Sequence, residues 1–166
     1  AWAQFALGAL YAGGQGMPQD YAQAAYWFEK AAAQAFPGAQ FYLGFLYQNG
    51  DGVPQDYAQA AYWFEKAAAQ GFPAAQLHLG FLYWNGLGVP KDNAQAAKWY
   101  EKAAAQGQAK AQYNLGMLYA EGDGVPQDHN KARQWGEKAA AQGDEVAQFN
   151  LGVMYANGQA VPRNYT

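Results

Sequence analysis

The sequence predicts an all-α fold, an α/α solenoid of about four and a half 36-residue helix-turn-helix repeats. Three observations predict it. One segment returns along the chain at a fixed spacing of 36 residues, which is typical of solenoid arrays. Each copy contains two stretches with small or apolar residues at helical spacing. Turn residues and helix caps separate the two stretches.

The repeat is clearest in residues 39–74, so we number its positions from Ala39 as position 1. We interpret residues 1–166 as a single array. Its copies are residues 3–38, 39–74, 75–110 and 111–146, with a partial copy at 147–166. Both ends of the chain look cut, so we expect each end to expose an apolar repeat face.

Positions 1 to 11 of the unit predict its first helix, because Ala39, Leu43 and Leu46 fall on one helical face. The first helices are expected to begin near Ala3, Ala39, Ala75, Ala111 and Ala147. Position 6 is glycine in every copy: Gly8, Gly44, Gly80, Gly116 and Gly152. A glycine inside a helix costs roughly 1 kcal/mol relative to alanine. We therefore expect the second helix to cross here too closely for a side chain.

A turn and a capped second helix follow. Gly50 and Gly52 suit the positive φ of a helix stop and loop. Asp56 is predicted to cap the second helix, with Gln59 at the capping-box spacing. Second helices are expected to begin near Tyr21, Tyr57, Asn93 and His129, and a glycine ends three of them. Ala35 replaces that glycine in the first copy, where we expect a less sharp junction.

Composition excludes several classes of function. The net charge is −3, with 13 acidic and 10 basic residues, whereas a nucleic-acid-binding domain needs a basic face. The chain has no cysteine, so disulfides and thiolate metal sites are excluded. No segment reaches the ~20 apolar residues of a membrane span. We therefore expect neither nucleic-acid binding nor membrane insertion.

The sequence also lacks the usual catalytic groups. It contains no serine, and Thr166 is the single threonine, so hydroxyl and thiol nucleophiles are effectively absent. His78 and His129 fall on different surfaces of the predicted repeat, which disfavours a shared metal ion. We interpret His78 as a polar groove residue. The prediction is a protein that is not an enzyme and holds no metal or cofactor.

The repeated residues resemble those of the Sel1-like repeat family, a relative of the tetratricopeptide repeat. The matching pattern is A-x-x-x-L-G-x-x-Y-x-x-G-x-G-V-P-x-D followed by A-x-x-W-F/Y-E-K-A-A-x-Q-G. The fourth copy departs from it at Gly136, where other copies have Phe28, Phe64 or Tyr100. This glycine leaves a gap or requires a neighbour to fill it.

The resemblance implies a right-handed superhelix whose first helices line the concave face. It also implies a scaffold or adaptor that assembles other proteins, with a bacterial envelope, periplasmic or secreted location favoured and a cytoplasmic one still open. A cysteine-rich branch of the family has been associated with β-lactam hydrolysis. Because this chain lacks the disulfides of that branch, we do not transfer the activity.

Positions 4, 7 and 11 of the first helix vary between copies while their neighbours are kept, and position 10 flanks them. They lie within about 60° of helical arc, opposite the packed face. Large apolar side chains among them favour a binding surface over neutral drift. For Phe45 and Phe81, packing between adjacent copies is an equal alternative. The predicted partner-binding residues are Tyr42, Phe45, Asn49, His78, Phe81, Trp84, Asn85, Asn114, Met117 and Glu121.

These observations predict a scaffold that binds a protein or peptide along its concave face. The asparagines at position 11 suit hydrogen bonds to an extended peptide backbone. Two alternatives stay open at this point. One is a small-ligand site or hydrolase in the groove, and the other is a structural spacer that associates end to end through its cut repeat faces.

Overall fold

The computed structural model describes residues 1–14 and 16–156, with side chains described as far as Val153. These residues form nine α-helices and no strand, which confirms the predicted all-α repeat fold. The helices are α1 (Trp2–Gly13), α2 (Tyr21–Ala32), α3 (Pro37–Asn49), α4 (Tyr57–Ala69), α5 (Pro73–Asn85), α6 (Asn93–Ala105), α7 (Ala109–Glu121), α8 (His129–Ala141) and α9 (Glu145–Ala156).

Second helices begin at the predicted residues, while first helices begin one or two residues earlier than predicted. The cause is visible in α3 and α5, where Pro37 and Pro73 occupy the first helical position. Proline has the backbone φ that a first turn needs, and its missing N–H has no helical partner there. The remainder of the predicted fifth copy, 157–166, lies outside the described residues.

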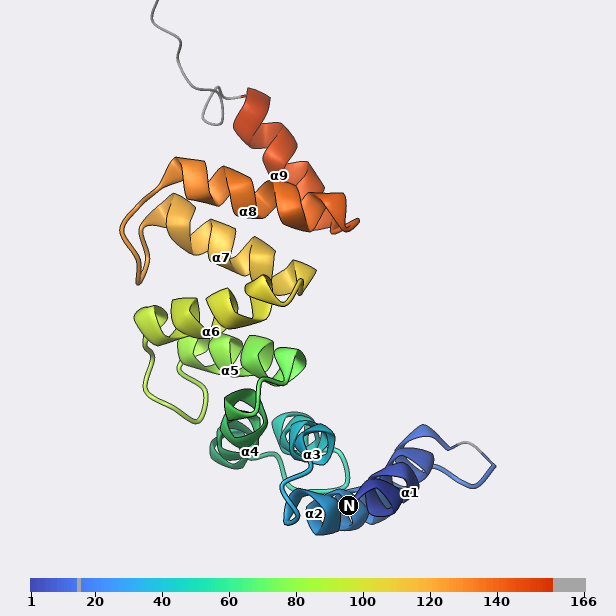
Figure 1. The fold of residues 1–166 in the computed structure, drawn as a ribbon. Coiled ribbons are helices and arrows are strands. Elements are labelled where there is room, and N and C mark those ends of the chain that lie inside the picture. The colour runs from blue at the N-terminus through green and yellow to red at the C-terminus, as the bar shows by residue number, and fades with distance from the viewer. Residues whose placement is uncertain (15, 157–166) are drawn as a thin grey trace, which may run out of the picture. The chain divides into compact units, whose positions relative to one another are not determined.

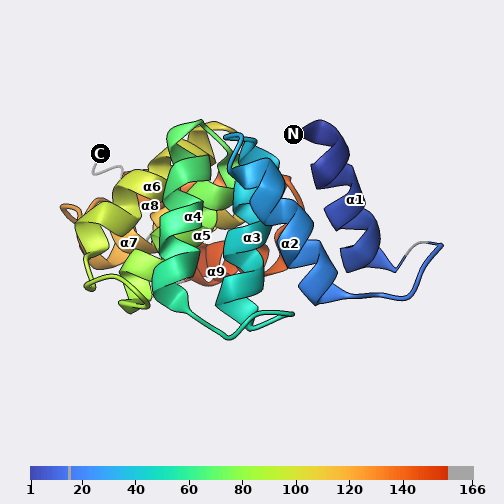
Figure 2. The ribbon, with the colours of Figure 1, turned by 90° about the horizontal axis from the view of Figure 1, so that it is seen from below.

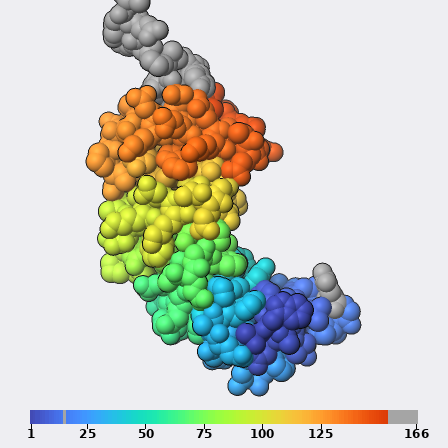
Figure 3. All heavy atoms as spheres, in the orientation of Figure 1, coloured from blue at the N-terminus to red at the C-terminus, as the bar shows by residue number. Residues whose placement is uncertain are grey.

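The chain divides into two compact units, Ala1–Lys91 and Asp92–Thr166, and each is described by itself. In the first unit, α1 packs on α2, α2 on α3, α3 on α4 and α4 on α5. In the second unit, α6 packs on α7, α7 on α8 and α8 on α9. Figure 2 shows the turn that joins adjacent ends of α3 and α4, so this pair is antiparallel. In each unit the copies follow one another as consecutive bands of colour (Figures 1 and 3). A single array of all five copies stays a prediction.

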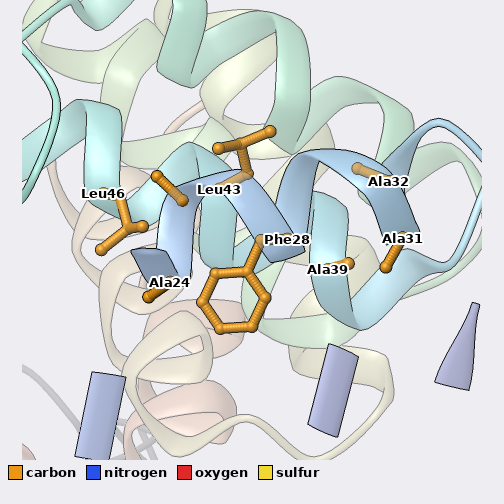
Figure 4. Packing of buried hydrophobic residues seen from close by; sticks show 8 residues of the cluster. Ala24, Phe28, Ala31, Ala32, Ala39, Leu43 and Leu46 are labelled. Atoms are coloured by element: carbon orange, nitrogen blue, oxygen red, sulfur yellow. The ribbon is translucent and has the colours of Figure 1, made fainter. Parts of the chain in front are cut away.

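In the first two copies, the core forms where an aromatic ring of the second helix lies over a glycine of the first. The Phe28 ring is 1% exposed and lies among the alanines of α2 and the apolar face of α3, including Ala24 and Ala39 (Figure 4). A Cβ atom built on Gly8 would lie 2.7 Å from this ring, and one on Gly44 would lie 2.8 Å from the Phe64 ring. Such distances are too short for carbon atoms, so Gly8 and Gly44 cannot carry a side chain unless the rings move.

Aspartate caps begin the second helices as predicted. Oδ1 of Asp56 accepts hydrogen bonds from the backbone N–H groups of Ala58 and Gln59, at 2.9 and 3.0 Å. The reciprocal half of the capping box is replaced by a different bond. The backbone N–H of Asp56 donates to the carbonyl of Tyr47 at 2.9 Å. The capping aspartate is therefore tied to the end of the first helix, which fixes the turn.

The second glycine of each turn provides a contact between copies. Gly52 has φ of +69°, and a Cβ atom on it would lie 2.2 Å from the carbonyl carbon of Tyr21 in the preceding copy. Gly88 approaches Tyr57 in the same way, also at 2.2 Å. The turn of one copy thus rests on the first residue of the preceding second helix. This close approach explains the G-x-G pattern together with the positive φ.

A buried glutamine at position 2 joins the second, third and fourth copies to the one before, a role that the sequence analysis missed. Gln40, Gln76 and Gln112 are 3–5% exposed. Their Nε2 atoms donate to the carbonyls of Ala32, Ala68 and Ala104, at 3.4, 3.2 and 3.1 Å. These carbonyls lie in the last turn of a helix, where acceptors lack helical partners. The glutamines therefore cap the preceding second helices.

The junction at Ala35 corrects a prediction. Ala35 has φ of +59°, close to the left-handed conformation of Gly71, Gly107 and Gly143, whose φ values are +85° to +89°. The expected less sharp junction was wrong, since the turn is kept and alanine adopts a backbone conformation that costs it about 1–2 kcal/mol. Its neighbours hold it there, because the Ala35 N–H donates to Ala32 O at 2.9 Å.

Ala35→Gly should stabilise the protein by roughly 0.5–1 kcal/mol, because relief of the left-handed strain exceeds the added freedom of the unfolded chain. The reverse change, Gly71→Ala, is the matched control, since nothing lies within 4 Å of an added Cβ there. It should destabilise by a similar amount. Urea unfolding followed by circular dichroism measures both, and a stabilising Gly71→Ala would contradict the explanation.

Gly44→Ala should destabilise the protein by on the order of 1–3 kcal/mol, because the added methyl group collides with the Phe64 ring. Gly116→Ala is the comparison, since Gly136 takes the place of that ring in the fourth copy. The nearest atom to its added Cβ is Ala132 O at 3.2 Å, so helix propensity should offset the cost. Differential scanning calorimetry compares the two, and equal losses would refute the ring-over-glycine account.

Candidate functional site: the first-helix face

In each unit, the first-helix face is the surface formed by repeat positions 4, 7, 10 and 11 of the first helices, as far as their side chains are described. These helices are α1, α3 and α5 in the first unit and α7 and α9 in the second. In the first unit, Tyr42 is 42% exposed and Phe81 is 38% exposed. Asn49 and Asn85 are also exposed, while Phe45, His78 and Trp84 are half-buried. The predicted residues of this unit therefore all reach the surface, to different extents. Their role in binding stays a prediction.

Residues at position 4 pack against the ring of the preceding second helix. Tyr42 stacks on Phe28, with ring centroids 5.4 Å apart and an interplanar angle of 17°. In the next copy, the ring centroid of His78 lies 5.1 Å from that of Phe64 in the preceding second helix. Its Nδ1 atom is 3.1 Å from Oε1 of Gln48. Position 4 thus combines a packing role between copies with partial exposure on the face.

Phe45 supports the packing alternative raised by the sequence. Its ring centroid lies 5.8 Å from that of His78 and 6.3 Å from that of Phe41. The contact with His78 joins α3 to α5, whereas the contact with Phe41 lies within α3. Phe45 is therefore a half-buried residue of the face whose ring is held in place by contacts with neighbouring rings. The Phe81 side chain is more exposed.

The asparagines at position 11 make hydrogen bonds within the chain. Nδ2 of Asn49 donates to a carboxylate oxygen of Asp51 at 3.2 Å. Nδ2 of Asn85 donates to the carbonyl of Phe81 at 2.9 Å. A side-chain amide has two N–H donors and an oxygen acceptor. Both side chains are thus oriented by one bond and keep hydrogen-bonding capacity for a ligand.

In the second unit, the predicted residues are Asn114, Met117 and Glu121. Among the described residues, the buried Tyr100 hydroxyl has no hydrogen-bond partner. Burial raises the pKa of Tyr100, and the nearby Asn114 side chain opposes this rise. Met117 is half-buried and Glu121 is exposed. Both line a hollow between α7 and α9.

Hollows lie between successive first helices in both units. Between α1 and α3, a hollow of about 320 Å³ is lined by Ala9, Phe28, Tyr42, Phe45 and Asp51, among others. Between α7 and α9, a hollow of about 260 Å³ is lined by Tyr113, Met117, Glu121, Gly136 and Asn150, among others. Each combines mostly apolar walls with one carboxylate. The gap expected at Gly136 is therefore confirmed.

Negative charge surrounds Tyr113 in the hollow of the second unit. Burial raises the pKa of Tyr113, and the carboxylates of Asp144 and Glu121 raise it further, against the effect of an Asn150 hydrogen bond. That bond runs from Nδ2 of Asn150 to the Tyr113 hydroxyl oxygen, at 2.7 Å. The hydroxyl therefore keeps its proton at neutral pH and has it available as a donor.

The opposite surface, formed by the second helices, also carries exposed rings, but lysines of the same helices cover them. Nζ of Lys30 lies 5.3 Å from the centroid of Tyr26, and that of Lys66 lies 4.9 Å from Tyr62. Lys102 and Lys138 lie over Trp99 and Trp135 at 4.1 and 4.2 Å. These cation–π contacts give the rings a partner within the chain.

Within residues 1–14 and 16–156, no group of three or more histidine or acidic side chains is arranged to hold a metal ion. No helix in this described part is long and apolar enough to cross a membrane. The His78 ring contacts three aromatic rings, those of Phe41 and Phe45 in α3 and that of Phe64 in α4.

Comparison with protein families decides the identity of the repeat. The model of the Sel1 repeat matches residues 3–36, 37–72, 73–108, 109–144 and 146–166. The chain belongs to the Sel1 repeat family. Proteins of this family are generally protein-interaction scaffolds without catalytic activity. A comparison with curated proteins found no match.

Solved structures of Sel1 repeat proteins are similar to this chain. A protective antigen of uropathogenic Escherichia coli with an SLR fold is 43% identical over 99% of this chain, with a TM-score of 0.94. A Sel1 repeat protein from Oxalobacter formigenes is 37% identical over 97% of the chain, with a TM-score of 0.91. The chain spans 35% and 66% of the lengths of these two proteins.

The cysteine-rich protein B of Helicobacter pylori is a more distant structural neighbour. It is 31% identical over 54% of this chain and 67% of its own, with a TM-score of 0.52. The present Sel1 repeats contain no cysteine. Their copies are held together by the buried glutamines and aromatic rings described above.

Proposed function

We propose that this Sel1 repeat chain is a non-enzymatic scaffold that binds a protein or peptide segment on its first-helix face. The observation that carries the proposal is the pair of hollows between successive first helices, lined by the residues that vary between copies. An apolar hollow with one carboxylate accepts a partner's apolar side chain and favours a nearby positive charge.

Exposed rings beside the first hollow support this choice of face. Tyr42 lines the hollow between α1 and α3, and Phe81 lies on the following first helix. Aromatic residues contribute much of the binding energy where a partner desolvates them. The rings of the second-helix surface already contact lysines of the same helices, so they offer less to a partner.

Asn49 and Asn85 support the proposal by their position and hydrogen-bonding capacity. Each lies at the last residue of a first helix, at one edge of the face. Each is oriented by a bond within the chain. Their remaining donor and acceptor groups suit the backbone of an extended segment, while the hollows receive its side chains.

The double change Tyr42→Ala and Phe81→Ala should weaken binding at least ~tenfold, because two exposed rings of the interface are removed. The partner is obtained by pull-down from the source cells and mass spectrometry. Isothermal titration calorimetry then gives its Kd for each variant.

Tyr62→Ala is the matched control, because Tyr62 is a 48% exposed ring on the second-helix surface of the same unit. It should leave the Kd unchanged. Circular dichroism melts must first show that both variants are folded, since Tyr42 also stacks on Phe28. An unchanged Kd in the double variant, or an equal loss in the control, would reject this face as the binding site.

A further inference from the structure

The fourth copy lacks the ring that fills the core of the other complete copies. Phe28, Phe64 and Tyr100 are 0–1% exposed, and Gly136 stands at the same repeat position. An added Cβ on Gly136 would have Leu151 Cδ1, at 3.9 Å, as its one neighbour within 4 Å. Gly136 lies inside α8, so its backbone is helical and permits any side chain. The space for a ring is therefore present while the ring is missing.

This space opens onto the first-helix face as the hollow of about 260 Å³, which we call the Gly136 hollow. Its apolar walls include Met117, Leu151 and Val153. Apolar cavities of about 150 Å³ take up benzene, so the hollow has room for a phenyl ring. Gly116, which faces the ring position, is kept. A partner's ring that enters the hollow would therefore contact Gly116 as the Phe64 ring contacts Gly44 in the second copy.

The polar groups at the hollow define the chemistry beside the ring. The Tyr113 hydroxyl accepts a hydrogen bond from Asn150 and retains its own proton as a donor. Glu121 lines the hollow and is exposed. Its carboxylate and that of Asp144 act together on Tyr113. The hydroxyl proton suits a peptide carbonyl, and the two carboxylates favour a positive charge next to the ring.

We propose that the Gly136 hollow binds a phenylalanine side chain of a peptide partner, with a lysine or arginine at the adjacent position near Glu121. The inserted ring takes the place that Phe28, Phe64 and Tyr100 occupy in their own copies. This inference rests on the proposed scaffold function and adds the chemistry of one recognised side chain. The evidence for the occupant is the missing ring, the retained glycine opposite it and the charge of the lining.

The test uses three capped dipeptides as probes: acetyl-Phe-Lys-amide, acetyl-Phe-Glu-amide and acetyl-Ala-Lys-amide. They are titrated into the ¹⁵N-labelled full chain and followed by NMR. The Phe-Lys probe should shift amide signals of residues that line the hollow. The Phe-Glu probe should bind about threefold more weakly, the size of an exposed charge interaction, and the Ala-Lys probe should give no saturable shift. Glu121→Gln should reduce the difference between Phe-Lys and Phe-Glu, because the Asp144 carboxylate remains.

Gly136→Phe fills the hollow from within, so it should abolish binding of the Phe-Lys probe. Gly136→Ala is the matched control, because it removes the same helical glycine but leaves the ring space empty. It adds only one methyl group to the wall of the hollow, so it should keep most of the probe binding that Gly136→Phe abolishes. If Gly136→Phe alone does not fold, the double change Gly136→Phe and Asn150→His replaces it, since this reproduces the Phe64–His78 pair of the second and third copies.

Saturable shifts that Gly136→Phe removes and Gly136→Ala keeps would support the inference. No shift at millimolar probe, or equal shifts in Gly136→Phe, would overturn it. A failure of the proposed scaffold function can be distinguished from a failure of this inference, because the scaffold test relies on Tyr42 and Phe81 in the first unit. A partner that depends on those residues while the dipeptides fail would overturn the hollow's role alone.

Discussion

The packing of an aromatic ring against a glycine is the constraint on which the first two repeats depend. The glycine at position 6 lets the second helix approach, and the ring at position 26 fills the space above it. The ring also meets position 4 of the following first helix, as Phe28 meets Tyr42 and Phe64 meets His78. One contact therefore determines both the packing within a copy and the packing onto the next. Alanines fill the remaining buried positions of the second helices α2, α4 and α6, where larger residues would separate the helices.

The same contact relates the architecture to the binding face. One side of the position-4 residue packs against the ring of the preceding second helix, and its other side is partly exposed. The residue at this position therefore shapes the surface between two successive first helices. Tyr42 forms part of the wall of one hollow, and Asn150 forms part of the wall of another. Where the ring is absent, at Gly136, Asn150 bonds to Tyr113 instead. The variation between copies at these positions therefore changes the shape and polarity of a common surface.

Much of the fold could be predicted from the sequence, because the 36-residue period, the aspartate caps and the glycines at fixed positions are local signals. The buried glutamines were missed, since a polar residue beside the apolar face gives no sign that it caps another helix. Its constancy in Gln4, Gln40, Gln76, Gln112 and Gln148 was the available signal. Ala35 was misjudged because bonds in the surrounding turn hold its backbone. The variation at position 4 indicated an exposed surface. Part of this variation, however, reflects packing against the ring of the preceding second helix.

The central claim is that the ring and the glycine are required together, and a double-mutant cycle on Gly116→Ala and Gly136→Phe tests it most directly. The fourth copy naturally lacks the ring, so each change can be made alone and in combination. Urea unfolding gives the free energy of unfolding of the four proteins. The account predicts that the double variant is less stable than the sum of the single effects, by on the order of 1–3 kcal/mol. Additive effects, within about 0.5 kcal/mol, would contradict it.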